Sequence, residues 1–324
     1  MEEEKKELPG QIERGLPFSV KKNIWLNILL FVITLFSTFF VGISLSLNYK
    51  YAEILVQNSH FSLDLENLKD PQIISLSIIY AAVLLGILLG HELGHFLTCR
   101  YYKINATLPY FIPAPTLIGT LGAFIKIKSP ITRKQQLFDI GVAGPLTGFI
   151  LSLPALIYGL SLSKVVPSIP REGTLFFGEP LLFKIIGGMI FKGTPAEFDV
   201  ILHPVAFAGW VGILVTALNL FPVGQLDGGH ISYALWGAKS RNIARFFMGV
   251  FVYMGIFFWV GWFLWGFLIF FLGLGHPRVL DEAAHLSPRR KFVGYVIVLI
   301  FILSFIPDPL KGYNLFDILR EFRF

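Results

Sequence analysis

Charged residues are scarce in this sequence of 324 residues. They make up 15% of the chain, whereas a soluble domain is usually about 25% charged. Hydrophobic residues reach 54%, and they come in long blocks. This composition excludes an ordinary soluble enzyme and predicts a polytopic membrane protein. The length suits one helical membrane domain.

Cysteine is nearly absent. Cys99 is the single cysteine, so an internal disulfide framework is excluded. No Gly/Ser-rich linker, heptad pattern or internal repeat is visible. Residues 1–22 mix acidic and basic side chains and lack the layout of a signal peptide, and we interpret them as a cytoplasmic tail. The formal net charge of +6 does not indicate nucleic-acid binding, because basic residues of membrane proteins collect on the cytoplasmic side.

Several apolar runs are long enough for a membrane-spanning helix of about 20 residues. They predict spans at residues 24–47, 73 to about 99, about 138–162, about 201–220 and 292–306. The block 243–274 is too long for one span, so we expect a helical hairpin that turns near residues 257–261. The short run 181–191 is expected at the membrane interface. The predicted fold class is an all-α polytopic membrane protein with about six to eight transmembrane helices.

The distribution of lysine and arginine predicts the orientation of these spans. Residues 100–136 contain no acidic residue and carry Arg100, Lys103, Lys126, Lys128, Arg133 and Lys134. The loop 48–72 is instead mainly acidic. We therefore expect a cytoplasmic N-terminus and a cytoplasmic segment 100–136. The location that we expect is the plasma membrane of a prokaryote.

The basic segment contains the stretch PTLIGTLGAFIKIKSP. Its residues alternate with a period of two over FIKIK, which is typical of a strand or hairpin. Open backbone cannot face lipid, so the strand has to pack on protein or line an aqueous cavity. We expect a small membrane-associated β element, with residues 122–128 as its edge.

The sequence HELGH lies within the second predicted span. His91 and His95 are four residues apart, which puts both imidazoles on one face of a helix. Glu92 stands beside the first of them, as in helical zinc peptidases. Buried structural polar residues are the alternative, but each ionisable group in a span costs at least about 2.5 kcal/mol. The pattern predicts one Zn²⁺ per chain, with Glu92 as the base that activates water.

A catalytic zinc ion needs a third protein ligand. Asp227, in the stretch TALNLFPVGQLDGGH, is the only acidic residue between residues 200 and 280. The glycines at 228 and 229 permit close approach of the backbone. Two alternatives remain open. In the first, Asp227 is not a ligand but caps the helix that follows it. In the second, His230 is the third ligand in place of Asp227.

The two stretches HELGH and NLFPVGQLDGG together resemble the site-2 protease family of intramembrane zinc metalloproteases, peptidases of the M50 type. That family reads HExxH followed by N/D-x-x-P-x-x-x-x-DG, and the second pattern is matched by Asn219, Pro222, Asp227 and Gly228. GTLGAFIKIKSP and AGPLTG resemble the β element and the small-residue motif of the family. HPVAFAGWVG resembles the EGY branch, and the loop 163–200 is too short for a PDZ domain.

The resemblance implies a membrane-embedded zinc metalloprotease domain over residues 23–310, with its core at 73–236 and a C-terminal tail at 311–324. It implies His91, His95 and Asp227 as zinc ligands and Glu92 as the catalytic residue. The residues implied to contact the substrate or its oxyanion are Asn219, Gly122, Ile125 and Ile127. The partners implied are the lipid bilayer and membrane proteins, which are cut within or next to their transmembrane segments.

Other interpretations remain. Asn219 could instead bond to backbone groups freed near Pro222. The whole protein could be a metal-ion transporter, or a catalytically inactive relative that binds membrane proteins. Of the remaining polar residues, we expect His203 and His276 to cap or turn the chain, His60 and His285 to be solvated, and Cys99 to be a small packing residue. No nucleic acid is expected as a partner, and no oligomeric state is predicted.

Overall fold

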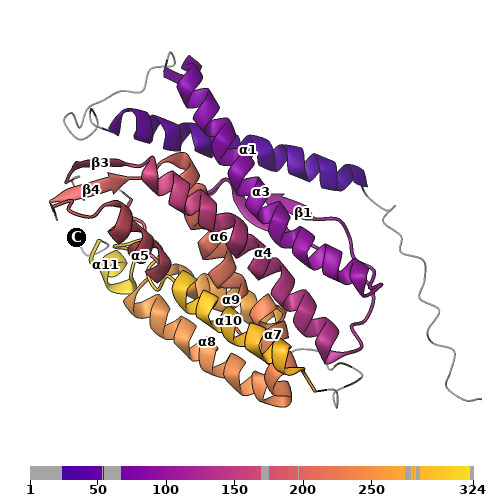
Figure 1. Ribbon diagram of the computed structural model, residues 1–324. Coiled ribbons are helices and arrows are strands. Elements are labelled where there is room, and N and C mark those ends of the chain that lie inside the picture. The colour runs from indigo at the N-terminus through magenta and orange to yellow at the C-terminus, as the bar shows by residue number, and fades with distance from the viewer. Residues whose placement is uncertain are drawn as a thin grey trace, which may run out of the picture.

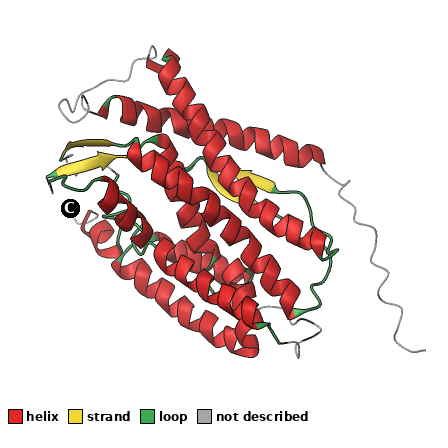
Figure 2. Ribbon diagram, in the orientation of Figure 1, coloured by secondary structure: helices red, strands yellow, loops and turns green. Residues whose placement is uncertain are grey.

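The computed structural model describes residues 24–52, 54, 67–168, 175–195, 197–273, 279, 281 and 285–321. Helices make up most of this part of the chain, and two small sheets lie apart from each other (Figure 2). The predicted tail 1–22, His60 and His276 lie outside the described residues.

Five helices occupy the five predicted single spans, with bounds that differ by a few residues. They are α1 (Ile24–Lys50), α3 (Pro71–Tyr101), α4 (Lys134–Ser161), α6 (Pro204–Asn219) and α10 (Pro288–Ser304). Three of them begin with proline, which suits a first helical position because the N–H there has no partner within the helix. Asp70 caps α3 and Ser287 caps α10 through oxygens that accept backbone N–H groups.

The helix of the fourth span begins slightly later than the predicted start near residue 201. Ile201 ends strand β4 (Phe198–Ile201), and α6 begins three residues later. Pro204 presets the helical backbone at the first position. His203 caps the helix because its Nδ1 accepts the N–H of Val205 at 3.2 Å. The capping role expected for His203 is thereby confirmed.

The block 243–274 folds as the predicted helical hairpin. Its arms are α8 (Ser240–Phe257) and α9 (Gly261–Leu272), so the turn falls at residues 258–260. The short apolar run forms α5 (Leu181–Ile190). The remaining helical elements are α7 (Asp227–Trp236), α11 (Leu315–Glu321) and the single turns η1 (Asn67–Lys69) and η2 (Gly237–Lys239).

The predicted β element is present, but its bounds differ. Strand β1 (Tyr110–Pro113) pairs antiparallel with β2 (Thr120–Phe124), so the expected strand over 122–128 is wrong in its second half. The ladder is interrupted because the N–H of Lys126 donates to the Thr107 side-chain oxygen, at 2.9 Å, rather than to a backbone carbonyl. Beyond this point Ile127 forms an isolated antiparallel bridge with Ala106.

This hairpin is held between α1 and α3. Asn27 of α1 donates to the carbonyl oxygens of Leu108 and Pro109 at 3.1 and 2.8 Å. At the other end of the hairpin, Ser37 donates to the Gly119 carbonyl at 2.6 Å. The backbone of the hairpin therefore finds partners in protein, as irregular chain at membrane depth requires.

A second sheet was not predicted. It consists of β3 (Lys164–Pro167) paired antiparallel with β4, and it lies in the segment between α4 and α6. Figure 1 shows it at the end of the helices that is far from α7. It therefore takes no part in the site described below.

The core lies where α3, α4 and α6 pack together. Fully buried apolar side chains from all three helices meet there, and they include Tyr80, Leu84, Leu156, Phe207 and Ile213. Helix α1 crosses α3 on the outside of this group, and α4 runs between α3 and α10 (Figure 1). The exposed side chains of α1 are largely apolar, as expected of a helix in contact with lipid.

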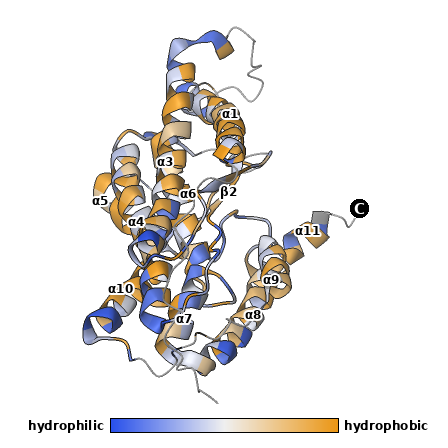
Figure 3. Cartoon of the chain, turned by 90° about the vertical axis from the view of Figure 1, so that its right-hand side faces the viewer, coloured by the Kyte–Doolittle hydropathy of each residue, from blue (hydrophilic) through white to orange (hydrophobic). Residues whose placement is uncertain are grey.

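Three helices in the described part of the chain are long and apolar enough to cross a membrane, namely α1, α3 and α4. Shorter apolar helices are α5, α6 and α9. Figure 3 shows hydrophilic residues gathered at the start of α10 and around α7, while α1 and α9 are hydrophobic over most of their length. The protein is thus a helical membrane protein with small antiparallel sheets.

Candidate metal centre

His91 and His95 lie one turn apart on α3 and face the same way. Both are buried, with 4% and 6% of their surface exposed. Their Nε2 atoms are 3.2 Å apart. Nδ1 of His95 donates to the carbonyl oxygen of Ile140 on α4, at 2.7 Å. This bond fixes the imidazole orientation and leaves the Nε2 lone pair directed toward His91.

Asp227 reaches this pair from α7. Helix α6 ends at Asn219, and the chain turns back through Pro222 before α7 starts at Asp227 itself. The turn is tight: a Cβ added at Gly228 would lie 2.0 Å from the Leu220 carbonyl oxygen, so only glycine fits. As a result Oδ2 of Asp227 lies 3.2 Å from Nε2 of each histidine.

These three donor atoms fit a zinc ion. They form a triangle with three edges of 3.2 Å. Zinc bonds of about 2.0–2.1 Å in tetrahedral geometry separate two ligand atoms by about 3.3 Å, which matches those edges. Two imidazole lone pairs and a carboxylate oxygen would repel one another without a cation between them. A zinc ion held by these three donors would keep one further position open for a reactant.

His230 lies outside this cluster. The group of ligand atoms within 4.8 Å of one another consists of His91, His95 and Asp227, within the ranges that the structure describes. His230 stands three residues further along α7. The geometry therefore favours the aspartate over the histidine as third ligand.

Helix α4 closes the site from one side. A Cβ added at Gly144 would lie 2.1 Å from Nε2 of His95, so α4 lies against the imidazole with no room for a side chain. Gly144 belongs to the AGPLTG stretch that the sequence singled out. The Ile140 carbonyl was not predicted, because any residue supplies a backbone carbonyl and the sequence carries no signal for it.

Glu92 is buried beside the cluster, with 6% of its surface exposed. Its carboxylate interacts electrostatically with His95 and Asp227 and lies near the backbone N–H of Ile125. Glu92 therefore joins the three candidate ligands to the chain segment that follows β2.

One edge of that segment is paired with residues 105–107. The Lys126 carbonyl accepts the Thr107 N–H at 3.0 Å, and the Lys128 N–H donates to Asn105 at 2.7 Å. In an antiparallel pair alternate residues bond in opposite directions. The backbone groups of Ile125 and Ile127 therefore point away from this partner, and that of Ile125 points toward Glu92.

The other residues predicted to contact the substrate make no hydrogen bond with His91, His95 or Asp227 in the described part of the chain. Asn219 is half-buried, and no hydrogen bond links it to the three candidate ligands. Gly122 has a φ of +100°, which L residues rarely adopt, and open space around its Cα. The side chains of Ile125 and Ile127 pack on a cluster around Phe96 and Cys99, so they face α3 and not the site.

Two minor expectations are confirmed. Cys99 is completely buried among apolar side chains and serves packing. His285 is exposed, as expected of a solvated loop residue.

The amino-acid sequence is similar to those of known proteins. The sequence model of Peptidase family M50 matches residues 79–262. "Probable zinc metalloprotease EGY2, chloroplastic" of Oryza sativa subsp. indica is 31% identical over 257 residues, covering 76% of this chain and 44% of the relative. "Probable zinc metalloprotease EGY1, chloroplastic" of Arabidopsis thaliana is 35% identical over 223 residues, covering 66% and 40%. This chain thus spans less than half the length of these relatives. No solved structure matches it.

Proposed function

Because this chain belongs to peptidase family M50, the site-2 protease family, we propose that it is an intramembrane zinc metalloprotease. It hydrolyses peptide bonds within or next to the transmembrane segments of membrane proteins. The observation that carries the proposal is the triangle of His91, His95 and Asp227 donor atoms at zinc-ligand spacing, with Glu92 beside it in an apolar helix.

The three donors hold one zinc ion per chain. A bound zinc ion supplies Lewis acidity, which polarises a peptide carbonyl and makes a water molecule a stronger acid. His95 keeps its orientation through the bond from Nδ1 to Ile140. Asp227 contributes one negative charge, which lowers the cost of holding a divalent cation in a site with little water.

Glu92 acts as the general base and then as the general acid. Its carboxylate takes a proton from the attacking water and later passes it to the nitrogen of the leaving chain. The backbone N–H of Ile125 lies near this carboxylate. The Asn219 amide makes no hydrogen bond within the described part of the chain and remains available to a substrate. We assign it to the carbonyl oxygen that becomes negative.

The substrate binds as a strand. A transmembrane helix hides its carbonyls in internal hydrogen bonds, so the segment to be cut has to unwind first. The outward backbone groups of Ile125 and Ile127 then pair with it by β-augmentation, and Gly122 leaves open space beside this edge. Because the Ile125 N–H adjoins Glu92, a strand paired here lies next to the catalytic carboxylate.

The catalytic unit extends over the membrane-embedded domain 23–310, with residues 73–236 as its core. We assign six to eight transmembrane helices to it, counting α6, α8, α9 and α10 with the longer spans. The N-terminus and the basic segment 100–136 lie on the cytoplasmic side of the membrane. The relatives named above are chloroplast proteins, so the expected prokaryotic plasma membrane gains no support from them.

The test compares the wild type with Glu92→Gln. Both proteins are purified in detergent, their zinc content is measured, and each is incubated with a panel of single-span membrane proteins. We expect one zinc ion in both and cleavage only by the wild type, because glutamine keeps the shape of the side chain but accepts no proton. Cleavage by Glu92→Gln near the wild-type rate would contradict the mechanism.

A further inference from the structure

Three polar side chains from different elements meet at the start of α4. Arg290 of α10 makes a bidentate ion pair with Asp139 of α4, with N–O distances of 2.8 and 2.7 Å. Tyr102, which follows α3, donates its hydroxyl hydrogen to Asp139. Asp139 thus ties the end of α3, the start of α4 and the start of α10 together.

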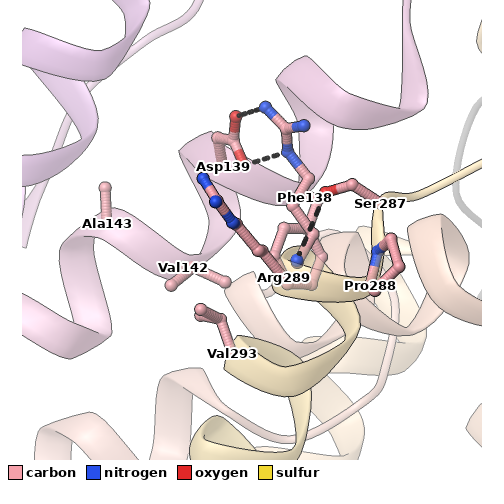
Figure 4. A pocket seen from close by; sticks show the side chains of 9 residues that line it. Phe138, Asp139, Val142, Ala143, Ser287, Pro288, Arg289 and Val293 are labelled. Atoms are coloured by element: carbon pink, nitrogen blue, oxygen red, sulfur yellow. Dashed lines mark hydrogen bonds and ion pairs between the residues drawn. The ribbon is translucent and has the colours of Figure 1, made fainter.

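Helices α4 and α10 pack through an apolar cluster that includes Phe138, Val142 and Ile297, and the ion pair joins the same two helices. An open pocket of about 830 Å³ lies between α4 and α10, and its walls include Phe138, Val142 and Val293. Figure 4 shows Asp139 at this pocket, joined by two dashed lines to a guanidinium group, while the Arg289 side chain is a separate group. The ion pair therefore lies at this open pocket, beside the apolar contacts between the two helices.

The same turn of α4 carries the group that orients a candidate metal ligand. Asp139 immediately precedes Ile140, whose carbonyl accepts the Nδ1–H of His95 at 2.7 Å. A shift of this turn therefore moves the acceptor, and the imidazole has to follow it or lose the bond. The ion pair and the hydrogen bond that sets the direction of Nε2 thus involve adjacent residues of α4.

We propose that Asp139, Arg290 and Tyr102 are positioning residues for the metal centre. They fix the first turns of α4, and the Ile140 carbonyl then holds His95 in the orientation that binds zinc. This inference rests on the proposed function, because it takes His95 as a zinc ligand. No signal in the sequence links these residues, since Asp139 and Arg290 are 151 positions apart.

The geometry of the pair makes the role specific to arginine. A guanidinium presents two parallel N–H groups to a carboxylate, whereas lysine offers a single point charge. The side chains are partly shielded, with 32% of Arg290 and 25% of Asp139 exposed. The chain before α10 adds support, because Gln135 donates to the His285 carbonyl at 3.2 Å.

The test uses the full chain in detergent and measures metal retention rather than proteolysis. The variants are Asp139→Asn, Arg290→Lys and Tyr102→Phe. The matched control is Arg289→Gln, because Arg289 is the exposed neighbour of Arg290 and lies outside the ion pair. For each protein we follow the rate of zinc release into a coloured chelator and the visible absorption spectrum of the Co²⁺-substituted form.

We expect Asp139→Asn and Arg290→Lys to release zinc about tenfold faster than the wild type, as is usual when groups behind a metal ligand are removed. Their Co²⁺ spectra should shift, because the His95 ring is no longer held. Tyr102→Phe should have a smaller effect in the same direction, and Arg289→Gln should match the wild type. The exchange Asp139→Arg with Arg290→Asp restores an ion pair and should recover part of the retention.

Several results would overturn the inference. One is zinc release within twofold of the wild type in both Asp139→Asn and Arg290→Lys. Another is lower thermal stability with unchanged zinc release and Co²⁺ spectrum, which would show a purely structural pair. If the single variants do not fold, the double variant with Asp139→Arg and Arg290→Asp decides. A folded double variant that retains zinc like the wild type supports the positioning role. A double variant that neither folds nor retains zinc overturns it. A wild type that binds no zinc would refute the proposed function itself, and so differs from these results.

Discussion

Gly144→Ala is the smallest change that should empty the metal centre. The added methyl carbon would lie 2.1 Å from Nε2 of His95, whereas ordinary contacts begin near 3.4 Å. Relief of the clash needs a movement of about 1.3 Å by the difference of these two distances. Metal sites require ligand distances within about 0.2 Å of their preferred values, so the displacement is several times larger than zinc binding tolerates.

The size of the effect follows from which group moves. Loss of a group behind a ligand costs about 10–100-fold in metal affinity. Gly144→Ala displaces the ligand atom itself, so we expect a loss at or above the upper end, about 100-fold or more. Gly148→Ala is the graded comparison, because its methyl carbon would lie 3.1 Å from Nδ1 of His91 and needs only a slight adjustment. Gly86→Ala is the control, with nothing within 4 Å.

The assay is competition for zinc between each purified variant and a chelator of known affinity, together with thermal unfolding to establish that the fold is intact. The expected order of zinc affinity is wild type and Gly86→Ala first, then Gly148→Ala, then Gly144→Ala. A folded Gly144→Ala protein that binds zinc as tightly as the wild type would refute the close approach of α4 to His95.

Three further predictions concern the ligands, the strand and the topology. Asp227→Ala should lose zinc while His230→Ala keeps it, as measured by metal content; the reverse result would make the histidine the third ligand. Ile125→Pro should reduce cleavage about tenfold or more with zinc content unchanged, because proline lacks the backbone N–H that the paired substrate strand needs, whereas Ile125→Val keeps that N–H and should cleave normally. Lys128→Cys, in a Cys99→Ala background, should react with a membrane-impermeant thiol reagent only from the cytoplasmic side, and labelling from the opposite side would contradict the orientation.

The spans could be predicted from the sequence because each depends on one uninterrupted apolar run. The start of α6 could not, because Ile201 is as apolar as the helix that follows it. Pro204, the cap by His203 and the pairing of β4 with β3 separate the two elements, and of these the sequence shows only the proline. The β3–β4 sheet was missed for a related reason: its strands are four residues each and lie more than thirty positions apart.

The candidate ligands could be proposed early because HELGH sets the spacing of His91 and His95 on a helix. Asp227 required more, since its place beside them depends on the tight turn at Gly228. The Asp139–Arg290 pair lay beyond sequence reasoning, because each residue alone reads as an ordinary charge near a helix start. The predicted strand extended to residue 128, whereas β2 ends at Phe124. Period-two alternation cannot reveal that the Lys126 N–H donates to the Thr107 side chain.

The central claim is that this chain cuts peptide bonds inside membrane segments with water activated beside Glu92. The most direct measurement is mass spectrometry of the products formed from single-span membrane proteins by zinc-loaded protein in H₂¹⁸O. The account predicts a new carboxyl terminus within or next to the apolar segment, carrying one ¹⁸O atom, and no such product with Glu92→Gln. Intact substrates with the zinc-loaded wild type, together with zinc movement into liposomes that contain it, would contradict the account and favour a metal-ion transporter.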